Sequence, residues 1–185
     1  MIRIPGQKVT LRPLRRGELD LLVDSYRRTA PALGLKPPSR DEIRRRVKRS
    51  GRLVRGRLEL AIEADGRLVG DVEARAPANA FPPGVYEVGV TVFDDGDRGR
   101  GYGHEATSLL VDHLFDAEEA ARVQASTAGW NRPMRAILVR LGFREEGVLR
   151  GFFPAGGGRD DYVLYAMTRA DWLARDGGPE EPDHL

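Results

Sequence analysis

The spacing of apolar and polar positions predicts one α/β domain of mixed α+β type. Strand-like runs rich in β-branched residues alternate with stretches whose apolar residues recur three and four positions apart, the spacing of a helix that buries one face. We expect helices at residues 16–30, from 40 onward, at 103–118 and at 131–142. We expect strands at residues 8–14, 58–64, 67–76, 85–93, 121–129, 144–153 and 160–168.

These elements predict a mixed central sheet of about six to seven strands flanked by helices. Asp65-Gly66, between two of the strand-like runs, is a strong signal for a tight hairpin. We expect the domain to occupy residues 1–174. Residues 175–185 are acidic and rich in Pro and Gly, which predicts a flexible tail.

Composition narrows the classes of protein that fit. The chain has 185 residues, of which 41% are hydrophobic and 31% charged, as in an ordinary soluble domain with one core. No apolar run approaches the roughly 20 residues that span a bilayer, and the N-terminus lacks the apolar stretch of a signal peptide. The absence of cysteine excludes disulfides and thiolate chemistry, and three histidines leave little for a metal centre. We therefore expect a cytoplasmic protein with no membrane contact and no metal.

Positive charge is concentrated in residues 40–57, although the net charge is only +2. One interpretation is contact with nucleic acid or another anionic ligand. The other is the solvated face of a helix, with Ile43 and Val47 four residues apart and facing inward. No aromatic residue interleaves with these charges to stack on bases, so the helix face is favoured and nucleic acid is not an expected partner.

A glycine-rich loop, "DRGRGYGHEA", connects the strand at 85–93 to the helix at 103–118. A helix that begins after such a loop presents free backbone N–H groups and a positive dipole end to an anion. The phosphate loop of nucleotide hydrolases is excluded, because no Lys-Ser or Lys-Thr follows the glycines. Residues Gly101 to Ala106 fit the dinucleotide pattern G-x-G-x-x-A, but a polar insert separates them from the strand. Arg98, Gly101 and Gly103 match the pattern Q/R-x-x-G-x-G/A, which cradles the pyrophosphate of coenzyme A.

A second, independent motif follows the glycine loop at the expected distance. It consists of Asn131, the triplet Leu141-Gly142-Phe143 and the pair Glu146-Gly147. With both motifs the sequence resembles the GNAT superfamily of N-acetyltransferases, and in particular the branch that acetylates ribosomal-protein N-termini and related amines. The resemblance covers roughly residues 8–173.

This resemblance implies that the fourth and fifth strands, at 85–93 and 121–129, splay apart and admit acetyl-CoA between them. Backbone groups of Val90, Thr91 and Val92 would pair with the pantetheine arm, and one N–H there would stabilise the developing oxyanion. Asn131 would hydrogen-bond the same arm and also cap its helix. The loop residues expected to hold the pyrophosphate are Arg98, Gly99, Arg100, Gly101, Tyr102 and Gly103.

The implied reaction is attack of a neutral amine on a thioester, which needs a group to remove a proton from the ammonium. Glu87 occupies the place of a glutamate that acts through water in many relatives; alternatively it orders the strand or binds substrate charge. Relatives carry a general-acid hydroxyl at the positions of Met134 or Leu138, and this chain has none there. The thiolate then leaves without an acid, or Tyr162 or Ser126 supplies the proton.

Tyr162 also ends the segment 152–162, which lines the acceptor site in relatives, so we expect it to contact the substrate; a simple hairpin turn is the alternative for this segment. The expected partners are acetyl-CoA and an amine acceptor. A protein N-terminus, an antibiotic or metabolite amine and an amino acid all remain open, and so does a homodimer. The missing hydroxyls keep a second function open, a non-catalytic acyl-CoA-binding or regulatory module.

Overall fold

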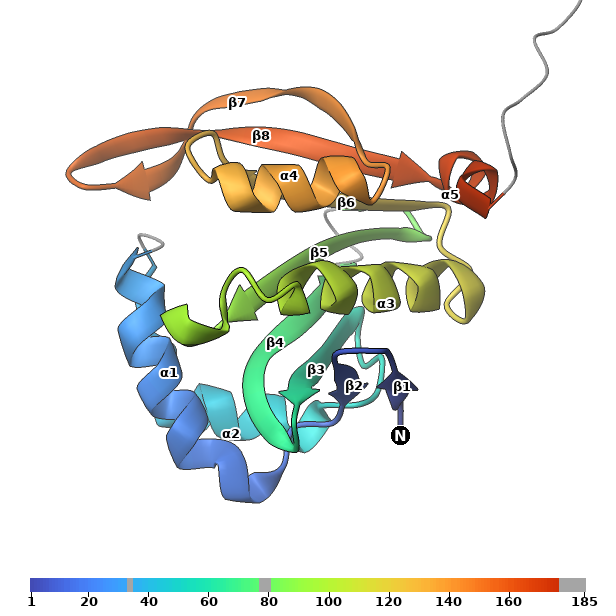
Figure 1. Ribbon diagram of the computed structural model, residues 1–185. Coiled ribbons are helices and arrows are strands. Elements are labelled where there is room, and N and C mark those ends of the chain that lie inside the picture. The colour runs from blue at the N-terminus through green and yellow to red at the C-terminus, as the bar shows by residue number, and fades with distance from the viewer. Residues whose placement is uncertain (33–34, 77–80, 177–185) are drawn as a thin grey trace, which may run out of the picture.

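One mixed sheet organises the domain, and helices cover both of its faces (Figure 1). The computed structural model describes residues 1–32, 35–76 and 81–176. The sheet has eight strands in the order β1-β2-β3-β4-β5-β6-β8-β7. The strands are β1 (Ile4–Pro5), β2 (Thr10–Arg12), β3 (Arg57–Ala64), β4 (Arg67–Arg75), β5 (Val85–Val92), β6 (Arg122–Ala128), β7 (Arg144–Ala155) and β8 (Gly158–Thr168).

The helices divide between the two faces of the sheet. On one face, α3 and α4 enclose the larger core cluster, in which Leu58, Val88, Leu110 and Leu138 are buried together. On the other face, α1 and α2 pack over a smaller cluster that includes Leu22, Ile43 and Ala61. The helices are η1 (Arg16–Glu18), α1 (Leu19–Ala32), α2 (Arg40–Arg49), η2 (Asp95–Asp97), α3 (Tyr102–Asp116), α4 (Arg132–Arg140) and α5 (Arg169–Asp176).

The expected α/β class and the flanked mixed sheet are confirmed, with eight strands where six to seven were expected. The additional strand is β1, only two residues long and too short to show an alternating pattern. Helix α5, which directly follows β8, was also missed. Of the expected tail, residues 175 and 176 belong to α5, and residues 177–185 lie outside the described part.

The basic run proved to be a helix with a buried apolar stripe. Ile43 and Val47 of α2 are both buried against the sheet, as the helix-face interpretation required. Ser39 caps this helix, and its hydroxyl accepts a hydrogen bond from the Glu42 N–H. Of the helices in the described ranges, none is both long and apolar enough to cross a membrane.

The expected splay is present between β5 and β6. These are the strands that the sequence predicts at 85–93 and 121–129, as the fourth and fifth of the sheet. They form the one parallel pair among the described strands, with register partners Val85–Arg122, Tyr86–Val123 and Glu87–Gln124. Beyond Glu87 the pairing stops, although β5 continues to Val92 and β6 to Ala128. The sheet is therefore open as a wedge whose apex lies at Glu87 and Gln124.

Candidate active site

The wedge exposes backbone in the middle of the sheet. Along the edge of β5 that faces away from the wedge, the strand stays paired with β4 as far as Val92, which lies opposite Gly70. On the β6 side, the residues after Glu87 have no strand partner within the described chain. Val90, Thr91 and Val92 are only half-buried, although β5 is a central strand. An extended molecule with amide groups can add to this edge in the way that a strand does.

The glycine loop lies where the open edge of β5 ends. Gly101 adopts a left-handed conformation with φ 87°, which a residue with a Cβ atom adopts at a cost. It occupies the N-cap position of α3 and provides no side-chain cap, so the first backbone N–H groups of this helix are left for another acceptor. Free N–H groups and the helix dipole suit a pyrophosphate, so these residues fit the expected anion.

Two contacts hold the loop in place from outside. Asp97, the first residue of the loop, is buried and accepts hydrogen bonds from both terminal nitrogens of Arg67, at 2.7 and 2.5 Å. This bidentate pair holds the pKa of Asp97 below its ordinary value. On the other side, Lys8 Nζ donates to the Arg100 carbonyl at 3.3 Å. Neither anchor was expected from the sequence.

The N-terminal hairpin that carries Lys8 is fixed by the first turn of α3. Both carboxylate oxygens of Glu105 are used: Oε1 accepts the N–H of Gln7 at 2.6 Å, and Oε2 accepts the N–H groups of Lys8 and Val9 at 2.7 and 3.0 Å. The backbone of the hairpin is thereby tied to α3, whose N-terminus is the candidate anion site. Lys8 places a positive charge beside Gly101 without belonging to either sequence motif.

The side chains of the loop point in different directions. Arg98 forms an ion pair with Asp95 at 2.5 Å, and Arg100 lies 3.8 Å from Asp97; both are largely exposed. Tyr102 is buried in the core at the start of α3, so of the expected loop residues it offers a ligand its backbone rather than its ring. Gly99 and Gly103 complete the loop, and a Cβ atom at Gly103 would lie 3.7 Å from Val92, in ordinary contact.

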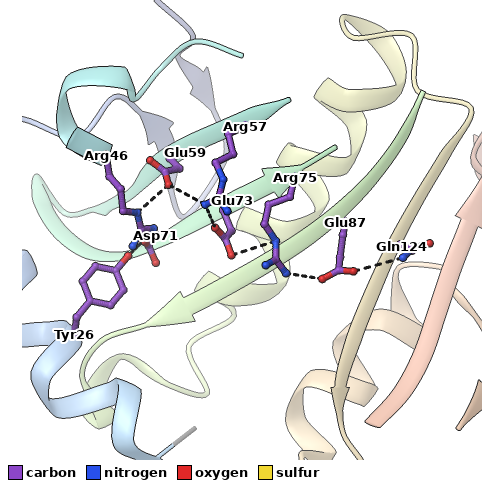
Figure 2. A network of polar contacts seen from close by, with 9 residues as sticks. All are labelled: Tyr26, Arg46, Arg57, Glu59, Asp71, Glu73, Arg75, Glu87 and Gln124. Atoms are coloured by element: carbon purple, nitrogen blue, oxygen red, sulfur yellow. Dashed lines mark hydrogen bonds and ion pairs between the residues drawn. The ribbon is translucent and has the colours of Figure 1, made fainter. Parts of the chain in front are cut away.

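Glu87 stands at the apex of the wedge, held from both sides (Figure 2). Its Oε1 accepts a hydrogen bond from Arg75 of β4 at 2.5 Å, and its Oε2 lies 3.5 Å from the Gln124 amide of β6. Both partners are its direct register neighbours across the sheet. The carboxylate is thus fixed at the point where the two strands separate.

The contacts continue from Arg75 toward the helices on the same face of the sheet (Figure 2). Glu73 lies 3.7 Å from both Arg75 and Arg57, and Arg57 lies 3.8 Å from Glu59. The inner end of this network is Arg46, which donates to Glu59 at 2.9 Å and to Asp71 at 3.1 Å.

At that inner end, Tyr26 donates a hydrogen bond to Asp71 beneath α1. Burial raises the pKa of Asp71, and Arg46 opposes this shift. Burial also raises the pKa of the Tyr26 hydroxyl, aided by the charge of Asp71. In this network carboxylates alternate with guanidinium groups, which do not release protons in proteins. The network can therefore orient Glu87, but it cannot carry a proton away from it.

The other expected site residues lie on the β6 side of the wedge. Asn131 caps α4: its Oδ1 accepts the Met134 N–H at 3.3 Å, and its Nδ2 donates to Thr127 at 3.1 Å. The capping role is therefore present, and contact with a ligand stays a prediction. Met134 is half-buried and Leu138 fully buried, so both positions serve packing.

The two hydroxyls considered as general acids are placed differently. Ser126 is two residues after Gln124 on β6, so the alternation of a strand places it on the face of the sheet where Glu87 lies. Tyr162 pairs in register with Ala128, which is about 13 Å further along β6 than Gln124 at roughly 3.3 Å per residue. Its ring stacks on Phe153, with centroids 5.0 Å apart, in the β7–β8 hairpin.

The segment 152–162 belongs to this hairpin, because β7 extends to Ala155 and β8 begins at Gly158. The structure therefore has the hairpin turn that was the alternative to a loop here. A role of Tyr162 toward an acceptor stays a prediction. No cluster of residues suited to a metal ion occurs in the part of the chain that the structure describes.

Comparison with known proteins gives the same family as the fold and the motifs. The model of the acetyltransferase (GNAT) domain matches residues 8–144. The chain is 27% identical over 92 residues to the uncharacterized N-acetyltransferase YnaD of Bacillus subtilis (strain 168), covering 50% of this chain and 54% of that protein. It is 29% identical over 75 residues to the ribosomal protein uS5-alanine N-acetyltransferase of Escherichia coli (strain K12), covering 40% and 39%. The chain thus spans about half or less of the length of these relatives.

Among solved structures, the ribosomal L7/L12 alpha-N-protein acetyltransferase RimL in complex with coenzyme A has the same fold. The TM-score is 0.77 over 90% of this chain and 98% of that chain, at 18% identity. Since the family model matches well over half of the sequence, the chain belongs to the GNAT family of acetyltransferases.

Proposed function

We propose that this protein is an N-acetyltransferase that moves an acetyl group from acetyl-CoA to a primary amine by direct attack in a ternary complex. The observation that carries the proposal is the end of β5–β6 pairing at Glu87 and Gln124. It leaves an open strand edge between a carboxylate at one end and the uncapped N-terminus of α3 at the other. When bound, acetyl-CoA would supply the thioester, and the chain would supply the groups around it.

The two faces of the sheet would separate the donor from the proton acceptor. Val90 faces α3, since a Cβ atom on Gly103 would lie 4.0 Å from Val90 Cγ2. Glu87 is an odd number of residues away on the same strand, so its carboxylate lies on the opposite face, which α1 and α2 cover. A donor anchored at Gly101 would thus approach from one face and the amine from the other.

Glu87 would then take the proton of the ammonium through a water molecule. Arg75 and Gln124 hold its carboxylate in one orientation, so no conformational search precedes the transfer. As the new C–N bond forms, the C–S bond breaks and sulfur leaves as a thiolate. Free thiols have a pKa near 8.5 (about that of cysteine), so this leaving group needs little help from an acid. Ser126 lies on the face of Glu87, from which the amine would approach, so its placement does not favour protonation of a sulfur on the opposite face.

Incubation of the purified chain with acetyl-CoA and a panel of primary amines tests the proposal, with release of the free thiol as the readout. Glu87→Gln removes the proton acceptor while keeping the shape, and we expect kcat to fall by about 10²- to 10³-fold. Asp116→Asn, at the far end of α3, is the matched control and should leave kcat unchanged. Full activity of Glu87→Gln would refute the assignment of the base.

The second candidate is an acyl-CoA-binding or regulatory module without catalysis. The apolar residues Met134 and Leu138, where relatives carry hydroxyls, favour it. Calorimetric binding of acetyl-CoA with no thiol release from any amine would establish this alternative. Two of the similar proteins carry a ribosomal protein in their names, so peptides that mimic a protein N-terminus belong in the panel beside small amines. A cytoplasmic location is part of the proposal, since the reaction needs acetyl-CoA.

A further inference from the structure

A pocket opens next to Glu87, and its lining is unusually rich in arginine. It is lined by Arg55, Gly56, Arg57, Arg75, Phe81 and Glu87. Glu87 is the residue proposed above to accept the proton, so a substrate in this pocket has its amino group at the reaction site. The side chains of the pocket then determine which amines fit. The inference drawn from them rests on the proposed function.

Register explains why these residues meet. Arg57 of β3 pairs with Arg75 of β4, and Arg75 pairs with Glu87 of β5, so the three form one row across the sheet (Figure 2). This row lies at the open end of the polar network. The side chains of Arg57 and Arg75 are 49% and 40% exposed, whereas those of Glu59 and Asp71, further in, are 3% and 6% exposed. A solute therefore reaches the arginines and not the inner carboxylates.

The lining of the pocket has three guanidinium groups and one carboxylate. Arg57 and Arg75 share Glu73, Arg75 also pairs with Glu87, and Arg57 lies 3.8 Å from the buried Glu59. Arg55 adds a third positive charge, and no carboxylate of the described chain lies within ion-pair distance of it. A ligand with a carboxylate would neutralise this surplus and accept hydrogen bonds in a geometry that a guanidinium group favours.

The backbone presents Arg55 at a fixed place. It lies in a two-residue turn with Gly56, at φ 51° and 68°, closed by hydrogen bonds between Val54 and Arg57 of 2.8 and 3.1 Å. The Gly56 carbonyl accepts the N–H of Ala76 at 2.6 Å, which ties the turn to the end of β4. A left-handed conformation is unfavourable for arginine, and glycine adopts it freely. The turn thus gains nothing locally from arginine at this position.

We propose that the acceptor is a primary amine that carries a carboxylate close to its amino group. The amino group would lie at Glu87, the carboxylate at Arg55 and Arg57, and the apolar part against Phe81. A free amino acid and a peptide N-terminus with an acidic side chain both offer this chemistry. A polyamine does not, because a second cation would face three guanidinium groups.

Matched pairs of acceptors test this inference. Alanine against alaninamide probes the free amino acid, and an Ala-Asp peptide amide against an Ala-Asn peptide amide probes an N-terminus. We expect kcat/KM to be at least about tenfold higher for the carboxylate member of one pair, as for hydrogen bonds to a charged group; the pair that discriminates identifies the source. Thiol release without discrimination in either pair overturns the inference and leaves the proposed function intact. No release with any amine overturns both.

A variant of the pocket, Arg55→Gly, tests the inference from the side of the protein. Glycine suits the left-handed turn, so the fold is preserved. We expect this variant to raise the KM for the carboxylate acceptor about tenfold, to leave the KM for its amide counterpart and for acetyl-CoA unchanged, and Arg55→Lys to recover part of the loss. Arg52→Gln is the control, since Arg52 lies in the same connection but does not line the pocket. Equal effects of Arg52→Gln and Arg55→Gly would indicate general electrostatics and refute the site.

Discussion

Arg75 and Glu87 face each other across the β4–β5 register, and the Arg75 guanidinium donates a hydrogen bond of 2.5 Å to the Glu87 carboxylate. The pair lies where β6 leaves β5, so it is half-exposed rather than sealed in the core. An ion pair in such a place contributes little to stability. Its effect is geometric: it selects one orientation of the carboxylate beside the open strand edge.

We therefore expect Arg75→Met to lower kcat about tenfold while the KM for acetyl-CoA stays within twofold, because the base loses its orientation and the donor site is untouched. Arg75→Lys should recover part of the rate, since an amine donates one hydrogen bond where the guanidinium matches the carboxylate better. Steady-state kinetics at saturating acetyl-CoA measures both. An unchanged kcat in Arg75→Met would mean that Gln124 alone orients Glu87.

The left-handed Gly101 gives a second prediction. Gly101→Val forces a β-branched residue to φ 87°, which is strained whatever space surrounds it, and we expect a loss of stability of about 1–2 kcal/mol and acetyl-CoA binding at least tenfold weaker. Gly103→Ala is the matched control: its new methyl group would lie 3.7 Å from Val92 and Ile137, so binding should stay within threefold. Calorimetric titration decides, and normal binding by Gly101→Val would show that the loop does not approach the donor closely.

Local sequence signals were sufficient for most of the elements and for the position of the glycine loop before α3. The Asp65-Gly66 turn, the periodicity of α3 and the glycine spacing each depend on residues close together in the chain. Arg75 and Gln124 could not be found in this way, because their contacts with Glu87 join residues 12 and 37 positions apart. Those contacts depend on strand register, which tertiary packing determines.

The anchors of the loop were missed for the same reason. Lys8 contacts Arg100 from 92 positions away, and nothing in the N-terminal pattern distinguishes this lysine from a solvated one. Helix α5 follows β8 without an intervening loop, so the end of the strand and the start of the helix were merged. At Tyr102 the motif located the backbone in the loop, but it did not indicate that the ring packs into the core, because that depends on tertiary contacts.

The Arg67–Asp97 pair gives a prediction with a defined pH dependence. Arg67 holds the pKa of Asp97 below its ordinary value of 3.8, so the folded state binds this proton less readily than the unfolded state does. The stabilisation is present above about pH 4 and is lost as the pH falls through the folded pKa. We expect Asp97→Asn to lower the melting temperature at pH 7 and to weaken acetyl-CoA binding several-fold, because the loop loses its anchor.

The Arg67–Asp97 pair also predicts that the melting temperatures of wild type and Asp97→Asn approach each other at acid pH. The difference in melting temperature between wild type and Asp97→Asn should shrink as the pH falls from about 4 through the folded pKa of Asp97, since the unfolded wild-type chain takes up this proton first and the folded chain follows. In a double-mutant cycle, Arg67→Gln and Asp97→Asn should be clearly non-additive. A difference in melting temperature that persists at acid pH would show that Asp97→Asn destabilises the protein for steric reasons and not because it removes the charge.

The inner end of the polar network predicts a loss of stability without a loss of chemistry. Arg46→Met leaves Asp71 buried without its cation and leaves Glu59 only Arg57, 3.8 Å away; removing one partner of a buried ion pair costs about 3–5 kcal/mol. Tyr26→Phe removes one hydrogen bond to Asp71 and should cost less, about 1–3 kcal/mol. Denaturant unfolding measures both changes.

Because Arg57, Glu73 and Arg75 lie between Arg46 and Glu87, the Glu87 carboxylate should keep its orientation when Arg46 is replaced. We expect the folded fraction of Arg46→Met to retain kcat within about twofold of wild type. If kcat falls as far in Arg46→Met as in Arg75→Met, the network acts as one unit and orients Glu87 from the buried end. If only stability falls, then the orientation of Glu87 depends on its register neighbours alone, and the buried end serves to join α1 and α2 to the sheet.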